Sequence, residues 1–245
     1  HRNNEFKLVY QPIVDLGDRR IHAVEVLLRW QHPVHGCLEP DIFLSLLEDS
    51  GLIVPVGERI LMDACQFLAT LPCSSDENFR ACINISPRQL EDGGFLLSVL
   101  DALYDADLDP ARLQLEFPES IVVNRSRLVQ RVLRELHSAG VQLALDHFGA
   151  GGISLADLVR LPINLIKLDH SLIEHIVEDR VSQAIASGTL ALAGTVDMQV
   201  AAVGVEQDLQ NGLLERLGCR EAQGRYYSYP LSATELCSVL LDTEH

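Results

Sequence analysis

Hydrophobic and polar positions alternate along this chain with two periodicities, one typical of strands and one typical of helices. The runs at 6–15 (FKLVYQPIVD) and 21–30 (IHAVEVLLRW) are both strand-like. Only the five residues LGDRR separate them, so the two strands are predicted to form an opening hairpin.

After this hairpin, short apolar runs alternate with amphipathic stretches. Further strands are predicted at 80–86, 113–117, 141–148, 164–169, 199–206 and 219–224. Helices are predicted at 41–51, 57–71, 95–106, 127–140 and 232–241, with Pro55 separating the first two. Seven or eight successive β/α units with nearly continuous apolar strands predict a parallel sheet covered by helices. Chain length and unit count favour a TIM-type (β/α)₈ barrel over an open doubly wound sheet.

Composition narrows the class of protein. The chain has 245 residues, of which 47% are hydrophobic, enough for one domain over 1–245 with a sizeable core. A formal net charge of −16 argues against binding to nucleic acid polymers or anionic membranes, and no long apolar run predicts membrane insertion.

Six scattered cysteines without a CxxC pair predict reduced thiols in a cytoplasmic protein. The start, HRNNEFKLVYQP, suggests that the chain is cut from a longer multidomain protein.

Polar residues interrupt the apolar strands near their carboxyl ends, where barrel enzymes carry their sites. They are Glu25, Asn84, Glu116, Asp146, Lys167 and Glu206. The first four offer oxygen ligands that suit Mg²⁺ or Mn²⁺, although any one of them could instead cap a helix or bond a loop.

Two cations accompany this acidic set. Lys167 and Arg29 could clamp a phosphate, Arg29 through its bidentate fork, or could form structural salt bridges. Asp169 lies two residues past Lys167, so the two side chains would point the same way in a strand and could pair.

Eight motifs in order give the chain a resemblance to EAL domains, the phosphodiesterases that cleave bacterial cyclic di-GMP. The motifs are YQPIVDL, EVLLRW, NIS at Asn84, LEFPES, LDHFGAGGISL, IKLDHSLI, VGVEQ and AQGRYYSYP. The resemblance implies a modified TIM barrel with an antiparallel first strand, in agreement with the predicted hairpin.

Several positions depart from the family pattern. Val26 replaces the signature alanine, a mild change, and Arg225 and the sequence GAGGISL replace the usual residues of two loops. His147 replaces the second of two successive acids, which serves the second metal ion, and Val203 replaces the glutamate of the AEGVE motif. Hydrolysis by two metals needs both ions, and an isopropyl group can neither bind a metal nor accept a proton. No catalytic residue, functional metal site or cofactor is therefore expected, and Glu25, Asn84, Glu116 and Asp146 are interpreted as vestigial metal ligands.

The resemblance also implies that ligand binding survives. The positions predicted to contact cyclic di-GMP are Gln11, Glu25, Leu27, Arg29, Pro40, Asn84, Asp146, Lys167, Glu206, Gln223, Gly224 and Pro230. The chain is then a cyclic di-GMP receptor. The EVL signature is similar to the FimX type of degenerate EAL protein, which implies a PilZ-type partner and control of type IV pili and twitching motility. Two alternatives stay open: a weak metal-dependent phosphodiesterase that uses His147 as a ligand, and an interaction scaffold that binds no nucleotide.

Overall fold

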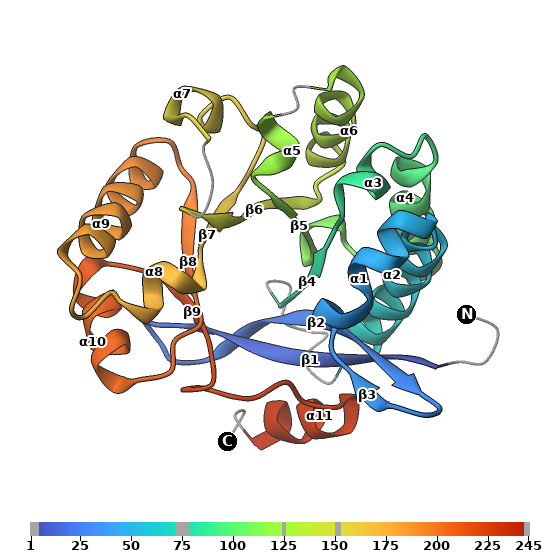
Figure 1. Cartoon of the computed structure of the whole chain (residues 1–245), viewed down its shortest axis with the longest axis horizontal. Coiled ribbons are helices and arrows are strands. Elements are labelled where there is room, and N and C mark those ends of the chain that lie inside the picture. Colours follow the sequence, from blue (N-terminus) through green and yellow to red (C-terminus); the bar gives the residue numbers. More distant parts are fainter. Residues whose placement is uncertain (1–4, 72–78, 124–125, 150–152, 243–245) are drawn as a thin grey trace.

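Eight strands close into a barrel, and helices surround it (Figure 1). The computed structural model describes residues 5–71, 79–123, 126–149 and 153–242. The strands are β1 (Phe6–Asp15), β2 (Ile21–His32), β3 (Gly36–Leu38), β4 (Arg80–Asn84), β5 (Leu113–Pro118), β6 (Gln142–Phe148), β7 (Leu165–Leu168), β8 (Gln199–Val203) and β9 (Glu221–Gln223).

Strand direction confirms the modified TIM barrel. The sheet runs β1-β9-β8-β7-β6-β5-β4-β2, and pairing of β1 with β2 closes it. Strand β1 is antiparallel to both of its neighbours, β2 and β9. All the other neighbouring pairs of the barrel, from β2–β4 round to β8–β9, are parallel. Strand β3 lies outside the barrel as a short hairpin partner of β2. The predicted opening hairpin therefore closes the barrel, through the pairing of β1 with β2.

Helices follow most of the strands, as the amphipathic stretches predict. They are α1 (Pro40–Ser50), α2 (Ile53–Thr70), α3 (Pro87–Leu90), α4 (Phe95–Asp105), α5 (Ser120–Val123), α6 (Arg127–Ser138), α7 (Leu155–Leu158), α8 (His170–Glu174), α9 (Arg180–Thr195), α10 (Asp208–Leu217) and α11 (Ala233–Asp242). The predicted start of the second helix after Pro55 is wrong, because α2 begins at Ile53. Proline fits in the first turn, where its missing N–H would have no helical partner.

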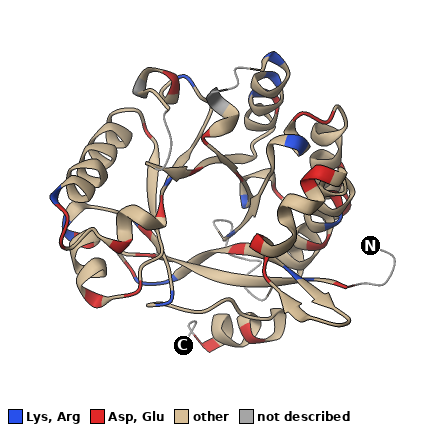
Figure 2. Ribbon diagram, viewed as in Figure 1, with Lys and Arg blue, Asp and Glu red and all other residues tan. Residues whose placement is uncertain are grey.

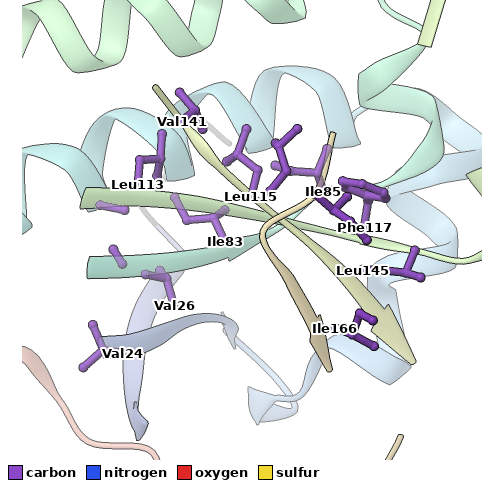
Figure 3. Close-up of a cluster of buried hydrophobic side chains, with 14 of the residues drawn as sticks. Val24, Val26, Ile83, Ile85, Leu113, Leu115, Phe117, Val141, Leu145 and Ile166 are labelled. Carbon is purple, nitrogen blue, oxygen red and sulfur yellow. The ribbon is translucent and has the colours of Figure 1, made fainter. Parts of the chain in front are cut away.

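Side chains alternate between two environments along each strand. Val24, Ile83 and Leu115 belong to the large apolar cluster that the strands form with the helices (Figure 3). The intervening positions face the barrel interior, where small apolar groups such as Ala23 and Cys82 share the space with buried polar residues. The polar interruptions of the apolar strands are therefore inward-facing positions, except Glu206, which lies beyond the end of β8 and is exposed.

Charge lies mostly on the outside of the molecule. Asp and Glu residues are distributed over several of the outer helices (Figure 2). Within the described part of the chain, no helix combines the length and the apolar character that a membrane crossing requires.

Candidate functional site

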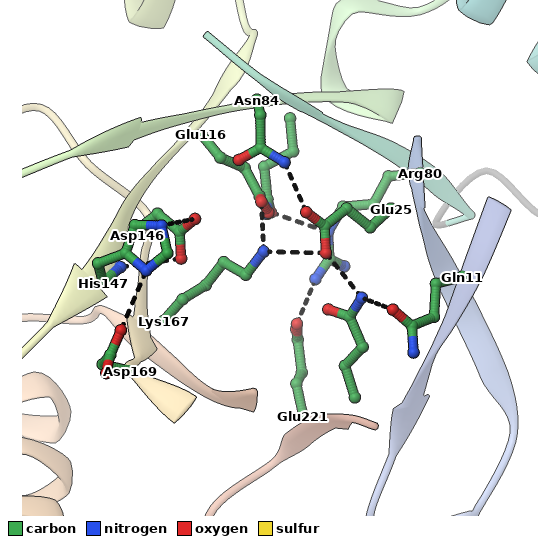
Figure 4. Close-up of polar contacts among 12 residues, drawn as sticks. Gln11, Glu25, Arg80, Asn84, Glu116, Asp146, His147, Lys167, Asp169 and Glu221 are labelled. Atoms are coloured by element: carbon green, nitrogen blue, oxygen red, sulfur yellow. Dashed lines mark hydrogen bonds and ion pairs between the residues drawn. The ribbon is translucent and has the colours of Figure 1, made fainter. Parts of the chain in front are cut away.

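Glu25 is the centre of a polar cluster at the barrel mouth. The amide of Asn84 donates to its Oε1 at 2.5 Å, and the amide of Gln223 donates to its Oε2 at 2.6 Å. Gln223 also donates to Oε1 of Gln11 at 3.0 Å, and the Lys167 ammonium lies 3.4 Å from Glu25 (Figure 4). Strands β1, β2, β4, β7 and β9 thus bring five predicted ligand-binding residues together. The buried Oε1 of Gln223 has no hydrogen-bond partner among the described residues, so it is available to a donor.

Glu116 and Lys167 form a fully buried ion pair below this cluster. The pKa of Glu116 is raised to about 7, mainly by burial and further by the nearby carboxylates of Glu25 and Asp146. The Lys167 ammonium acts in the opposite direction but does not cancel these effects. Burial alone would lower the pKa of Lys167, but Asp146, Glu116 and Glu25 outweigh it and raise that pKa well above its usual range. Lys167 therefore remains charged and balances the acids around it.

A hydrogen-bonded chain supports Glu116 from below. Its Oε1 accepts from the amide of Gln114 at 2.8 Å, and the Gln114 oxygen accepts from Arg80 at 3.0 Å. Arg80 in turn pairs with the buried Glu221 at 2.5 Å. None of these three supporting residues was among the predicted site residues. The signal that could have found them is the period of two, since each lies an even number of residues from a predicted inward-facing side chain.

His147 lies at the mouth between two carboxylates (Figure 4). Its Nδ1 is 3.0 Å from Oδ2 of Asp169, and its Nε2 is 3.5 Å from Oδ2 of Asp146. Partial burial acts to raise the pKa of Asp169, but hydrogen bonds from Ser171 and His147 outweigh it and hold that pKa below its ordinary value. The predicted pairing of Asp169 with Lys167 is wrong: β7 ends at Leu168, and Asp169 caps the amino end of α8 through Ser171.

A cavity of about 390 Å³ opens at this mouth, a size typical of small-molecule sites. Apolar side chains make up much of its wall, including Leu27, Pro40 and Leu44. Asn84, Asp146, His147, Lys167 and Val203 also line it. The arrangement combines a slot for an apolar or aromatic group with polar contacts on one side.

Four predicted contacts lie elsewhere on the rim. Arg29 lies 3.8 Å from Glu39 and donates to the carbonyl of Leu28, and its predicted contact with phosphate stays a prediction. Glu206 follows β8, is exposed, and pairs with Arg225 at 3.3 Å. Gly224 and Pro230 follow β9. A Cβ on Gly224 would lie 2.0 Å from the Val205 carbonyl oxygen, so only glycine fits there.

The residues present do not fit the two-ion site that the resemblance implies. Among the described residues, no three His, Cys, Asp or Glu side chains are arranged to hold a metal ion. Lys167 contacts two of the four vestigial ligands, and Val203 places an isopropyl group in the wall. Among the described residues, Val203 and His147 therefore supply no carboxylate at these two positions, and His147 engages Asp146 and Asp169.

Comparison with known proteins gives one consistent family. The family model for the EAL domain matches residues 1–230. An uncharacterized protein of Synechocystis is 39% identical over 239 residues, covering 98% of this chain and 34% of that protein. The bifunctional diguanylate cyclase/cyclic di-GMP phosphodiesterase MucR of Pseudomonas aeruginosa is 36% identical over 229 residues, covering 94% of this chain and 33% of its own. The chain thus spans about a third of the length of these relatives.

Solved structures agree with this assignment. The EAL enzyme Bd1971, with cAMP and cyclic di-GMP bound, superimposes with a TM-score of 0.93 at 32% identity, covering 98% of this chain and 65% of that one. The P. aeruginosa MucR phosphodiesterase in complex with cyclic di-GMP superimposes with a TM-score of 0.91 at 35% identity, covering 96% of this chain and 95% of that one. The FimX EAL domain of P. aeruginosa gives 0.83 at 24% identity over 94% of this chain and 92% of that one. This last likeness shows the fold alone, so the FimX-type assignment stays a prediction.

Proposed function

The chain belongs to the EAL domain family, and on that premise we propose that it acts as a cyclic di-GMP receptor that has lost hydrolysis. The observation that carries the proposal is the cavity at the barrel mouth, which keeps polar contacts while Val203 and His147 stand in its wall. Cyclic di-GMP is bound in the MucR and Bd1971 structures that superimpose on this chain.

Ligand binding rests on groups that hydrolysis does not need. The apolar walls formed by Leu27 and Pro40 suit a guanine face, and the amide of Asn84 in the same wall suits a polar group of the base or ribose. Lys167 supplies a buried positive charge beneath the phosphates, although two carboxylates share it. Arg29 and Glu206 contribute from the rim, each after exchanging its present partner.

Hydrolysis would need chemistry that these side chains do not supply. A general base contributes about 10²–10⁴-fold to such reactions, and Val203 has no lone pair with which to act as one. Removing an acid from the mouth also removes repulsion toward a doubly negative ligand. Loss of turnover and retention of binding therefore follow from the same substitutions.

Output through a protein partner completes the receptor hypothesis. The proposal includes a PilZ-type partner and a role in type IV pilus control, in the cytoplasm, and rests here on the EVL signature, Glu25–Leu27.

Weak metal-dependent hydrolysis is the second candidate, and the names of the relatives favour it. MucR, at 36% identity, and the PdeR phosphodiesterase of Escherichia coli, at 32%, are named for cyclic di-GMP hydrolysis. In this hypothesis His147 would act as a nitrogen ligand for Mn²⁺.

Titration calorimetry with cyclic di-GMP tests binding. We expect saturable heat at about micromolar ligand with the wild-type protein. The dissociation constant of Arg29→Ala should be at least about tenfold higher, because a charge-assisted hydrogen bond contributes about 1.5–3 kcal/mol. Arg131→Ala is the matched control, since Arg131 is exposed on α6 and pairs only weakly with Glu135 at 3.9 Å. Absence of both heat and thermal shift at tens of micromolar ligand would remove the receptor hypothesis.

Chromatography of an overnight incubation with Mg²⁺ or Mn²⁺ separates the two candidates. We expect intact cyclic di-GMP with the wild-type protein, and linear dinucleotide with the double variant Val203→Glu, His147→Asp, which restores both acids. Rapid linearisation by the wild-type protein would instead establish the phosphodiesterase.

A further inference from the structure

We propose that the imidazole of His147 occupies the gap between Asp146 and Asp169 that a divalent cation would otherwise take, so that the domain binds its ligand without a metal at this position. The part that concerns the ligand rests on the proposed receptor function. The part that concerns the cation stands on the geometry of the three side chains alone.

The ring bridges two structural elements. Nδ1 of His147 lies 3.0 Å from Asp169, which caps the amino end of α8, and Nε2 lies 3.5 Å from Asp146 on β6. Each ring nitrogen therefore faces a different carboxylate. A single cation placed between two such carboxylates would make the same connection through metal–oxygen bonds.

Each oxygen of the two carboxylates already lies beside a group of the protein, because both Oδ1 atoms accept from backbone N–H groups and both Oδ2 atoms face a nitrogen of the His147 ring. Oδ1 of Asp146 accepts from the His147 backbone N–H at 2.9 Å, and its Oδ2 faces the ring. Oδ1 of Asp169 accepts from the backbone and the hydroxyl of Ser171 at 2.9 and 2.5 Å, and its Oδ2 accepts from the ring. A hard divalent cation binds such oxygens at about 2.0–2.6 Å, and the ring fills the space beside both Oδ2 atoms. The ring would have to leave before an ion could enter.

The backbone holds the ring in this gap. His147 has a φ of +58°, in the left-handed region that few side chains adopt. The register between β6 and β7 shifts between Leu145 and Phe148, so a bulge carries Asp146 and His147 out of regular pairing. Bulges of this kind re-aim a side chain next to a site.

Two described residues of the cavity wall add no free carboxylate oxygen to this gap. Val203 supplies an isopropyl group to the cavity, and Lys167 already satisfies Glu25 and Glu116. The His147 ring thus makes the bridge between the end of β6 and the start of α8 from the chain itself.

Titration of Mn²⁺ without nucleotide, followed by the electron paramagnetic resonance signal of the free ion, tests the blocked gap. We expect no saturable site in the wild-type protein below about 1 mM, and binding at least about tenfold tighter in His147→Asp. His147→Ala, which removes the ring and adds no ligand, should lie between the two. His137→Asp on α6 is the matched control, because it adds the same charge at an exposed position away from the mouth.

Two results would overturn the proposal that His147 blocks a cation site between Asp146 and Asp169. One is wild-type binding of Mn²⁺ as tight as that of His147→Asp. The other is a correctly folded His147→Asp variant, as judged by circular dichroism, that still lacks a site.

Calorimetry with cyclic di-GMP in EDTA and in Mg²⁺ tests the consequence for the ligand. We expect equal dissociation constants within about twofold, and a requirement for Mg²⁺ would contradict metal-free binding. No heat in either buffer would defeat the receptor function, while the Mn²⁺ titration would still decide whether His147 blocks the ion.

Discussion

Lys167 shows at the scale of one residue how the barrel tolerates buried charge. Its ammonium contacts Glu116 and lies 3.4 Å from Glu25, while Asn84 and Gln223 donate to the remaining lone pairs of Glu25. A buried charge without such partners would cost several kcal/mol. The cluster is therefore stable only as a set, and single substitutions within it act on the whole set.

Glu116→Gln gives a test at this scale, because it keeps the shape of the side chain and removes its titration. The pKa of Glu116 rises from 4.5 to about 7 in the folded protein. Between these values the folded state holds a proton that the unfolded state has released, so the free energy of unfolding falls as pH rises.

Urea unfolding of both proteins at about pH 5 and about pH 7.5 measures the effect. We expect the wild-type protein to lose on the order of 2 kcal/mol relative to Glu116→Gln across this range. Parallel stability profiles would show that Glu116 ionises with an ordinary pKa in the folded state.

At the scale of elements, the ends of β8 and β9 are joined closely. Val203 pairs with Gln223, and the backbone N–H groups of Gly204 and Val205 both donate to the Gln223 carbonyl, at 2.9 and 3.0 Å. The next residue, Gly224, packs directly against the backbone of Val205. The position of the Gln223 side chain beneath the mouth therefore depends on a glycine that follows it.

Gly224→Ala is expected to separate these two strand ends. Its Cβ would lie 2.0 Å from the Val205 carbonyl oxygen, so the backbone must move, and we expect a loss of at least about 3 kcal/mol with weaker ligand binding.

Gly188→Ala is the matched control for this substitution. Gly188 lies inside α9, and a Cβ there would meet nothing within 4 Å. Thermal unfolding should show it to be more stable than wild type by about 0.5–1 kcal/mol. Equal destabilisation by both substitutions would contradict the close packing of β8 on β9.

At the scale of the whole molecule, polar side chains run through the barrel from one end to the other. The chain of contacts begins at Glu221 and Arg80, passes through Gln114, Glu116, Lys167 and Glu25, and ends at Gln223 and Gln11. Barrel interiors are more often filled with layers of branched apolar side chains. Here the apolar cluster lies between strands and helices and supplies the hydrophobic stability (Figure 3).

Arg80→Leu tests how much this interior depends on paired charge. The substitution leaves the buried Glu221 with only the His22 ring as a basic neighbour, at 3.8 Å, and we expect a loss of about 3–5 kcal/mol in the free energy of unfolding. The double variant Arg80→Leu, Glu221→Leu should recover much of that loss, because it removes the unpaired charge. A double variant no more stable than the single one would indicate that Gln114 and Glu116 need Arg80 for other reasons.

The order of the elements could be predicted from sequence because it depends on local periodicity. The opening hairpin, the β/α alternation and the polar strand ends all follow from side chains a few residues apart. The identities of His147 and Val203 are likewise properties of the chain, and so is the lack of a carboxylate at these two positions. The prediction at Pro55 was wrong by four residues, because a first helical turn accepts a proline that an interior turn rejects.

Only the tertiary structure decided which polar groups meet. Asp169 bonds His147 rather than Lys167, and Arg29 lies beside Glu39, because strand ends, a bulge and a helix cap set those positions. Gln114 and Arg80 support Glu116 only through the register of β4 and β5. Periodicity assigns a side chain to a face, whereas a contact between distant strands depends on register, and register is fixed when the whole barrel closes.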